Sequence, residues 1–154
     1  MISNAQRRTV LLIQHDRLRA RIAALRSAAA AVITHGADVP QTATDELMQS
    51  IAAFGGELTT HLETEEDMLI PVLEQSHPWG AVRIQLLHAE HAHQRGVLHV
   101  LRAATLRPAE LARRAWALTT DVLADMEAEE KDLFSEAVLG QDPPEQAPAP
   151  DEFR

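Results

Sequence analysis

Hydrophobic residues recur along most of the chain at alternating spacings of three and four, which is the period of an amphipathic helix. Four such segments are separated by turn-like stretches at residues 35–40, 76–80 and 106–108, each of which contains Gly or Pro. We therefore expect helices over about residues 3–34, 42–75, 81–105 and 108–139. Ser3 and Gln6 form a possible capping box at the start of the first helix. Pro108 suits the first turn of the fourth helix.

Four long helices joined by short loops favour an all-α fold, an up-down-up-down antiparallel four-helix bundle. Two helical hairpins that dimerise through their apolar faces are the alternative. The bundle is expected to occupy residues 1–139 as one domain. The remaining segment, 140–154, contains four prolines and is acidic. Because prolines cannot continue a helix, we expect a disordered Pro-rich C-terminal tail there.

The same spacing assigns a core-facing seam to each helix. The first seam comprises Leu11, His15, Leu18, Ile22 and Leu25. The second comprises Leu47, Ile51, Phe54, Leu58, His61, Glu65, Met68 and Val72. The third comprises Ile84, Leu87, His91, Gln94, Leu98 and Leu101, and the fourth Leu111, Ala115, Leu118, Val122, Asp125, Glu129 and Asp132.

Ionisable groups interrupt these apolar seams, and a single one of them is usually only a hydrogen-bonded core residue. A set of them is different, because burying several carboxylates together without a cation is costly. Imidazole and carboxylate together suit iron, manganese or zinc. The metal-ligand candidates are His15, His61, Glu65, His91, Asp125 and Glu129.

Two of the segments also resemble each other. HLETEEDML at 61–69 and DMEAEEKDL at 125–133 share three glutamates and a leucine at equal spacing. The second and fourth helices therefore look pseudo-equivalent, as they would around a shared central site. In both segments a Glu one residue beyond the candidate ligand, Glu66 or Glu130, is a possible hydrogen-bond acceptor for a ligand histidine.

Composition narrows the function further. The chain has 154 residues, and 14 Lys and Arg against 23 Asp and Glu give a net charge of −9. This charge argues against binding nucleic acid or an anionic membrane surface. Cysteine is absent, so there is no disulfide, thiolate metal site or thiol nucleophile. With no apolar run long enough to span a membrane and no signal-peptide pattern, we expect a cytoplasmic protein.

Taken together, these motifs resemble a bacterial hemerythrin-like (HHE cation-binding) domain over roughly residues 7–136. The resemblance rests on His15, the His61-x-x-x-Glu65 pair, His91 in AEHAHQR and the acidic helix that ends EEKDLF. The resemblance implies a four-helix bundle with a non-haem centre, usually di-iron. It further implies that His15 and His61 serve one metal and His91 the other, with Glu65 and Glu129 as bridges.

Two positions depart from the family pattern. Asp125 stands where the fourth helix usually carries a histidine, and no second histidine lies four residues from His91. The site is therefore poorer in histidine than that of an oxygen carrier. Asp125 is predicted to be a metal ligand, or to face a ligand water on the metal nearer His91. This favours handling or sensing of dioxygen, peroxide or nitric oxide, possible enzymatic peroxide breakdown included. A metal-free bundle that acts as an interaction or structural module is the alternative. The oligomeric state stays open.

Overall fold

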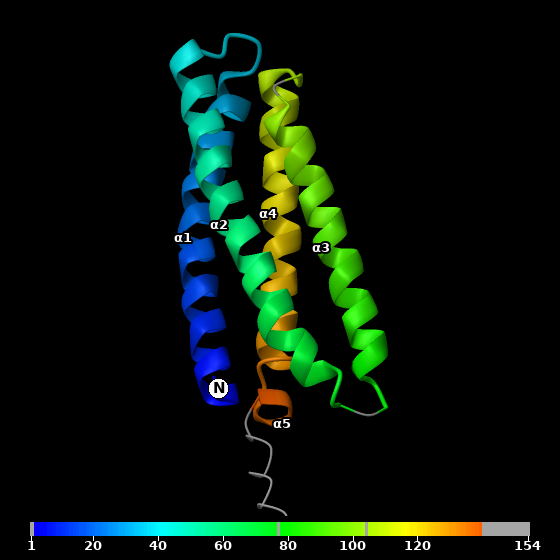
Figure 1. The fold of residues 1–154 in the computed structure, drawn as a ribbon. Coiled ribbons are helices and arrows are strands. Elements are labelled where there is room, and N and C mark those ends of the chain that lie inside the picture. Colours follow the sequence, from blue (N-terminus) through cyan, green and yellow to red (C-terminus); the bar gives the residue numbers. More distant parts are fainter. Residues whose placement is uncertain (1, 77, 104, 140–154) are drawn as a thin grey trace, which may run out of the picture.

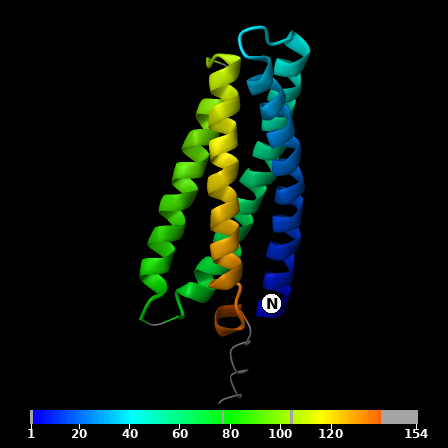
Figure 2. The same cartoon turned by 180° about the vertical axis from the view of Figure 1, so that it is seen from behind.

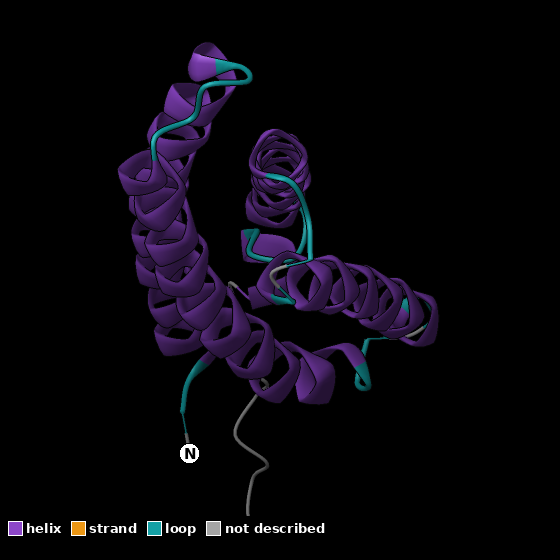
Figure 3. Ribbon diagram, turned by 90° about the horizontal axis from the view of Figure 1, so that it is seen from above, coloured by secondary structure: helices purple, strands orange, loops and turns teal. Residues whose placement is uncertain are grey.

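The computed structural model describes residues 2–76, 78–103 and 105–139, and all their regular structure is helical. The elements are α1 (Asn4–His35), α2 (Gln41–Leu73), α3 (Gly80–Arg102), α4 (Pro108–Lys131) and the short α5 (Glu136–Leu139). Successive long helices run in opposite directions (Figures 1 and 2), and short loops join them (Figure 3). The predicted up-down-up-down bundle is confirmed. The predicted tail at 140–154 lies outside the described residues.

Local signals set the helix starts. The Ser3 hydroxyl accepts from the Gln6 backbone N–H at 3.2 Å, while the Gln6 side chain accepts from the Ser3 N–H at 2.8 Å. This is the predicted capping box, and it satisfies two otherwise unpaired donors. Pro108 occupies the first position of α4, where its missing N–H has no cost.

Two apolar clusters fill the interior, and the ionisable groups lie between them. The larger cluster draws residues from all four long helices of the single chain. The smaller cluster comprises Leu11, Leu69, Leu73, Phe134 and Leu139. His15 lies one helical turn from Leu11 of the smaller cluster and one from Leu18 of the larger. The ionisable groups are therefore closed off by apolar side chains on both sides.

The predicted seams hold for most of their length and fail at several ends. All five predicted positions of α1 are buried. In α2, however, Met68 and Val72 are half-buried, and Leu69 and Leu73 take the core positions. A spacing of 3.5 drifts by about 20° per heptad against a straight α-helix, so a long seam assigned this way rotates out of the core.

The same drift applies to α3 and α4. Ile84 is half-buried at the start of the α3 seam, and Asp125 is half-buried while Met126 is buried beside it. Asp132 is exposed and pairs with Arg83 at 2.8 Å. The prediction of an inward-facing Asp132 was therefore wrong.

The prediction that the fourth helix continues to residue 139 was also wrong. α4 ends at Lys131, and a turn leads into α5. In that turn the Phe134 N–H donates to the Glu129 carbonyl at 2.8 Å, one residue beyond the usual helical partner. Arg8 of α1 donates to the Phe134 carbonyl at 2.8 Å. The turn brings the fully buried Phe134 ring to 5.0 Å from the ring of His15, beneath the polar groups.

Two glycines of α3 should respond oppositely to replacement by alanine. A Cβ at Gly80 would lie 1.8 Å from the Leu73 carbonyl oxygen, whereas a Cβ at Gly96 meets nothing within 4 Å. Gly80→Ala should lower the free energy of unfolding by about 1–3 kcal/mol, because backbone must move. Gly96→Ala should raise it by about 0.5–1 kcal/mol. Urea unfolding measures both, and equal effects would contradict the close approach at Gly80.

Candidate metal centre

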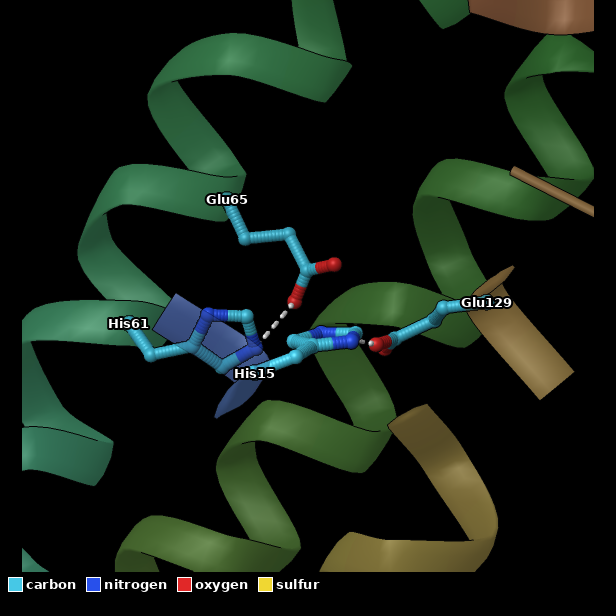
Figure 4. Close-up of side chains that lie close together, drawn as sticks. All are labelled: His15, His61, Glu65 and Glu129. Carbon is cyan, nitrogen blue, oxygen red and sulfur yellow. Dashed lines mark ion pairs between the residues drawn. The ribbon is translucent and has the colours of Figure 1, made fainter. Parts of the chain in front are cut away.

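Four buried side chains from three helices converge at the centre of the bundle. His15 comes from α1, His61 and Glu65 from α2 and Glu129 from α4, and one nitrogen or oxygen of each lies within 4.8 Å of the others. In Figure 4 their polar atoms point toward one another. His61 Nε2 lies 3.4 Å from Glu65 Oε2, and His15 Nε2 lies 3.3 Å from Glu129 Oε2.

A third imidazole reaches the same carboxylate from α3. His91 Nε2 lies 3.2 Å from Glu65 Oε2, and the His91 side chain is only 2% exposed. Glu65 is fully buried, so one carboxylate oxygen faces two imidazoles from two helices. Of the six predicted ligands, the structure thus brings five together: His15, His61, Glu65, His91 and Glu129.

Each of these imidazoles is held through its other nitrogen by a residue of a different helix. The Nδ1 contacts are His15 to Glu130 at 2.8 Å, His61 to Gln14 at 3.1 Å, and His91 to Glu66 at 2.7 Å. An ionised carboxylate or an amide oxygen only accepts, so the proton resides on Nδ1. This directs the lone pair of each Nε2 toward the centre, as in a metal-ligating histidine.

Arginines fix two of the three acceptors. Arg19 donates to Glu130 at 2.6 Å and Arg95 donates to Glu66 at 2.7 Å. The Arg95 guanidinium is the main reason that the pKa of Glu66 is lowered. Burial alone would raise the pKa of Glu130, but its bonds to His15 and Arg19 lower it. The repeated pairing supports the pseudo-equivalence of α2 and α4 and the expected acceptor role of both glutamates.

The electrostatics of the centre are unfavourable without a cation. Burial raises the pKa of Glu65 to about 7. Burial, together with the charges of His15 and His91, lowers the pKa of His61 to about 3. Burial also opposes protonation of His15 and His91, but their bonds to glutamates outweigh it and raise both pKa values. The centre therefore holds protons where a metal ion would otherwise balance the carboxylates.

Several inward atoms have no hydrogen-bond partner among the described residues. One is Glu65 Oε1. The others are His15 Nε2 and Glu129 Oε2, whose 3.3 Å contact is an ion pair without hydrogen-bond geometry, and all three atoms are shielded from solvent. Unpaired buried polar atoms cost free energy, and native proteins leave few of them. Three imidazole nitrogens and two carboxylates are donors that iron, manganese and zinc accept. The residues present therefore fit a metal ion or a metal pair.

The comparison with protein families agrees with this geometry. The family model described as Hemerythrin HHE cation binding domain matches residues 8–137, which is most of the chain. The chain belongs to the hemerythrin HHE family. Searches of the curated proteins and of the solved structures found no match. The family description and the buried His and Glu cluster together support metal binding at this centre.

Asp125, the sixth predicted ligand, is not among the five converging residues, although it lines a groove together with Glu129. It is half-buried, and its Oδ2 accepts from the Gln94 side chain at 2.5 Å. Whether Asp125 coordinates a metal stays a prediction. Sequence analysis did not assign a role to Gln14, which supports His61. Nothing in the sequence pattern singled out Gln14 for this contact.

The glutamates that hold the imidazoles should control metal affinity. Glu66→Ala and Glu130→Ala should each weaken metal binding by about 10- to 100-fold, the usual effect of losing such support. Glu127→Ala is the matched control, because Glu127 is exposed and, among the described residues, forms an ion pair only with Lys131, at 2.7 Å. Calorimetric titration with Mn²⁺ measures the three affinities. Equal affinity in all three variants would show that the Nδ1 contacts do not orient ligands.

Proposed function

We propose that this chain is a non-haem iron protein whose bundle core would hold two iron ions through His15, His61, His91, Glu65 and Glu129. Its exogenous ligand is dioxygen, peroxide or nitric oxide. The observation that carries the proposal is the convergence of three imidazole Nε2 atoms on buried carboxylates, with Glu65 Oε2 3.4 Å from His61 and 3.2 Å from His91. A metal-free interaction module would gain nothing from this costly arrangement.

The chain's own residues would bind the metal, orient the ligand side chains and enclose the centre. The three imidazoles present neutral nitrogen donors, and Glu130, Gln14 and Glu66 keep their lone pairs inward. Apolar clusters on both sides exclude water and strengthen each electrostatic contact. Bound iron supplies redox chemistry and a coordination position for a small ligand. A groove of about 170 Å³ between α3 and α4 reaches Glu129 and gives such a ligand a route inward.

Peroxide addition to the iron-loaded protein tests the proposed ligand class. One peroxide takes two electrons and two protons to become two waters, so a ferrous pair needs no external reductant for one turnover. We expect a new absorption band of ferric iron on stoichiometric peroxide addition. His91→Ala should weaken it, whereas His93→Ala should not, because His93 is 63% exposed on its side chain. Unchanged spectra with peroxide, dioxygen and nitric oxide would refute the proposed ligand class.

Metal affinity should rise with pH. Glu65 must ionise to bind a cation and has its pKa raised to about 7, while the raised pKa values of His15 and His91 also favour protons. Protons therefore compete with metal more strongly as the pH falls. Below pH 7 each displaced proton should cost about tenfold in affinity per pH unit. Chelator competition between about pH 6 and pH 8 measures this, and a flat profile would contradict it.

A further inference from the structure

Gln94 and Asp125 form a polar pair beside the metal centre that the five converging residues do not include. Gln94 lies one turn after His91 on α3 and is only 3% exposed. Its Nε2 donates to Asp125 Oδ2 at 2.5 Å, which fixes the amide orientation because that carboxylate oxygen must accept. Gln94 Oε1 is buried and has no hydrogen-bond partner among the described residues. A buried amide oxygen in this state is a free acceptor next to a carboxylate.

The groove between α3 and α4 joins this pair to the core. The two helices diverge toward the end where α3 begins (Figures 1 and 2), and there the groove encloses about 170 Å³. Its walls include Glu90, Asp125 and Glu129, so Glu129 lines the groove and also contacts His15. A cation in the groove would thus lie next to the cluster of imidazoles and carboxylates.

The groove concentrates negative charge that its own arginine does not balance. Glu90, Asp125 and Glu129 all line it. Arg83, the arginine of the wall, is paired with Asp132 at 2.8 Å. Three carboxylates therefore line one groove, and the Gln94 amide is hydrogen-bonded to one of them. A hard cation would relieve the repulsion between these carboxylates.

We propose that the second ion position of this centre is oxygen-rich, formed by Gln94 Oε1 and Asp125 beside His91 and Glu129, with Glu90 at its outer mouth. The inner position, with His15, His61, Glu65 and Glu129, is richer in nitrogen. Oxygen ligands favour hard ions such as Mn²⁺ or ferric iron. The inner position therefore binds first and tightly, and the outer position binds hard ions more weakly and exchanges them through the groove.

This inference rests on the proposed function, because Glu129 serves both positions. A titration with Mn²⁺ alone separates them, with the free ion measured by its electron paramagnetic resonance signal. Wild-type protein should show two classes of site. His61→Ala should weaken the tighter class, whereas Gln94→Leu and Asp125→Asn should each weaken the looser class at least about 10-fold. Gln94→Glu, which adds a carboxylate, should strengthen that class.

The matched control is Asp121→Asn, one turn before Asp125 on the same helix face, where Asp121 is 54% exposed on its side chain. It should keep both classes, and melting of each metal-free variant checks that the bundle is folded. One class in the wild type, or a looser class unaffected by Gln94→Leu and Asp125→Asn, would overturn the oxygen-rich position and leave the inner site standing. No Mn²⁺ or iron binding at all would refute the proposed function itself.

Discussion

Replacing Glu65 by Gln should remove more metal affinity than any other single substitution in the core. Glu65 is fully buried and is the carboxylate that contacts imidazoles from both α2 and α3, at 3.4 and 3.2 Å. Glutamine keeps the size but loses the charge and one acceptor oxygen. We expect affinity to fall by more than about 100-fold, the upper figure for residues that only support a ligand. Metal analysis of purified protein measures the loss.

The same substitution should leave the metal-free bundle at least as stable as the wild type. Glu65 Oε1 is buried without a hydrogen-bond partner in the described structure, which costs about 1–3 kcal/mol. A neutral amide is less costly to bury than a carboxylate. Glu63→Gln is the control, because Glu63 is exposed on the same helix. If Glu65→Gln and Glu63→Gln retain equal metal, Glu65 is not a ligand.

The largest effect on stability is expected at Phe134. Its ring is fully buried in the smaller apolar cluster and lies 5.0 Å from the His15 ring. Phe134→Ala should lower the free energy of unfolding of the metal-free protein by about 3–5 kcal/mol, the usual cost of truncating a buried Phe. Leu86→Ala, at a residue 57% exposed, should change it by no more than about 0.5 kcal/mol. Urea unfolding compares the two.

Phe134→Ala should also speed metal release, because the ring separates His15 from solvent on the side of the smaller apolar cluster. Transfer of bound metal to a chelator, followed by stopped-flow absorption, measures the rate. If stability falls but the release rate matches the wild type, Phe134 supports the fold without sealing the site.

Hydrophobic spacing was enough to predict the bundle and most of the centre. His15 and His61 lie on apolar stripes at positions that any helix of this register must bury, so their inward direction follows from periodicity alone. Glu65 follows one turn after His61 on the core-facing seam of α2. His91 lies on the core-facing seam of α3. The sequence therefore predicted the five residues that converge, because each is fixed by its own helix.

Contacts between helices were less predictable. The partner of His61 is Gln14, and nothing in the spacing along α1 singles out Gln14 from its neighbours. The predicted core-facing positions Met68 and Asp132 also turned out not to be buried, because a spacing assigned over many turns accumulates rotation about the helix axis. The turn that places Phe134 under His15 depends on a bond from Arg8, which is 126 residues away in sequence.

The central claim is that the core of the bundle binds metal, and metal content with thermal stability tests it most directly. Protein purified without chelator should contain iron, and anaerobic ferrous addition to metal-free protein should raise its melting temperature, because an ion that binds only the native state stabilises it. Glu65→Gln should show neither effect. Absence of iron, manganese and zinc, with an unchanged melting temperature after ferrous addition, would contradict the account.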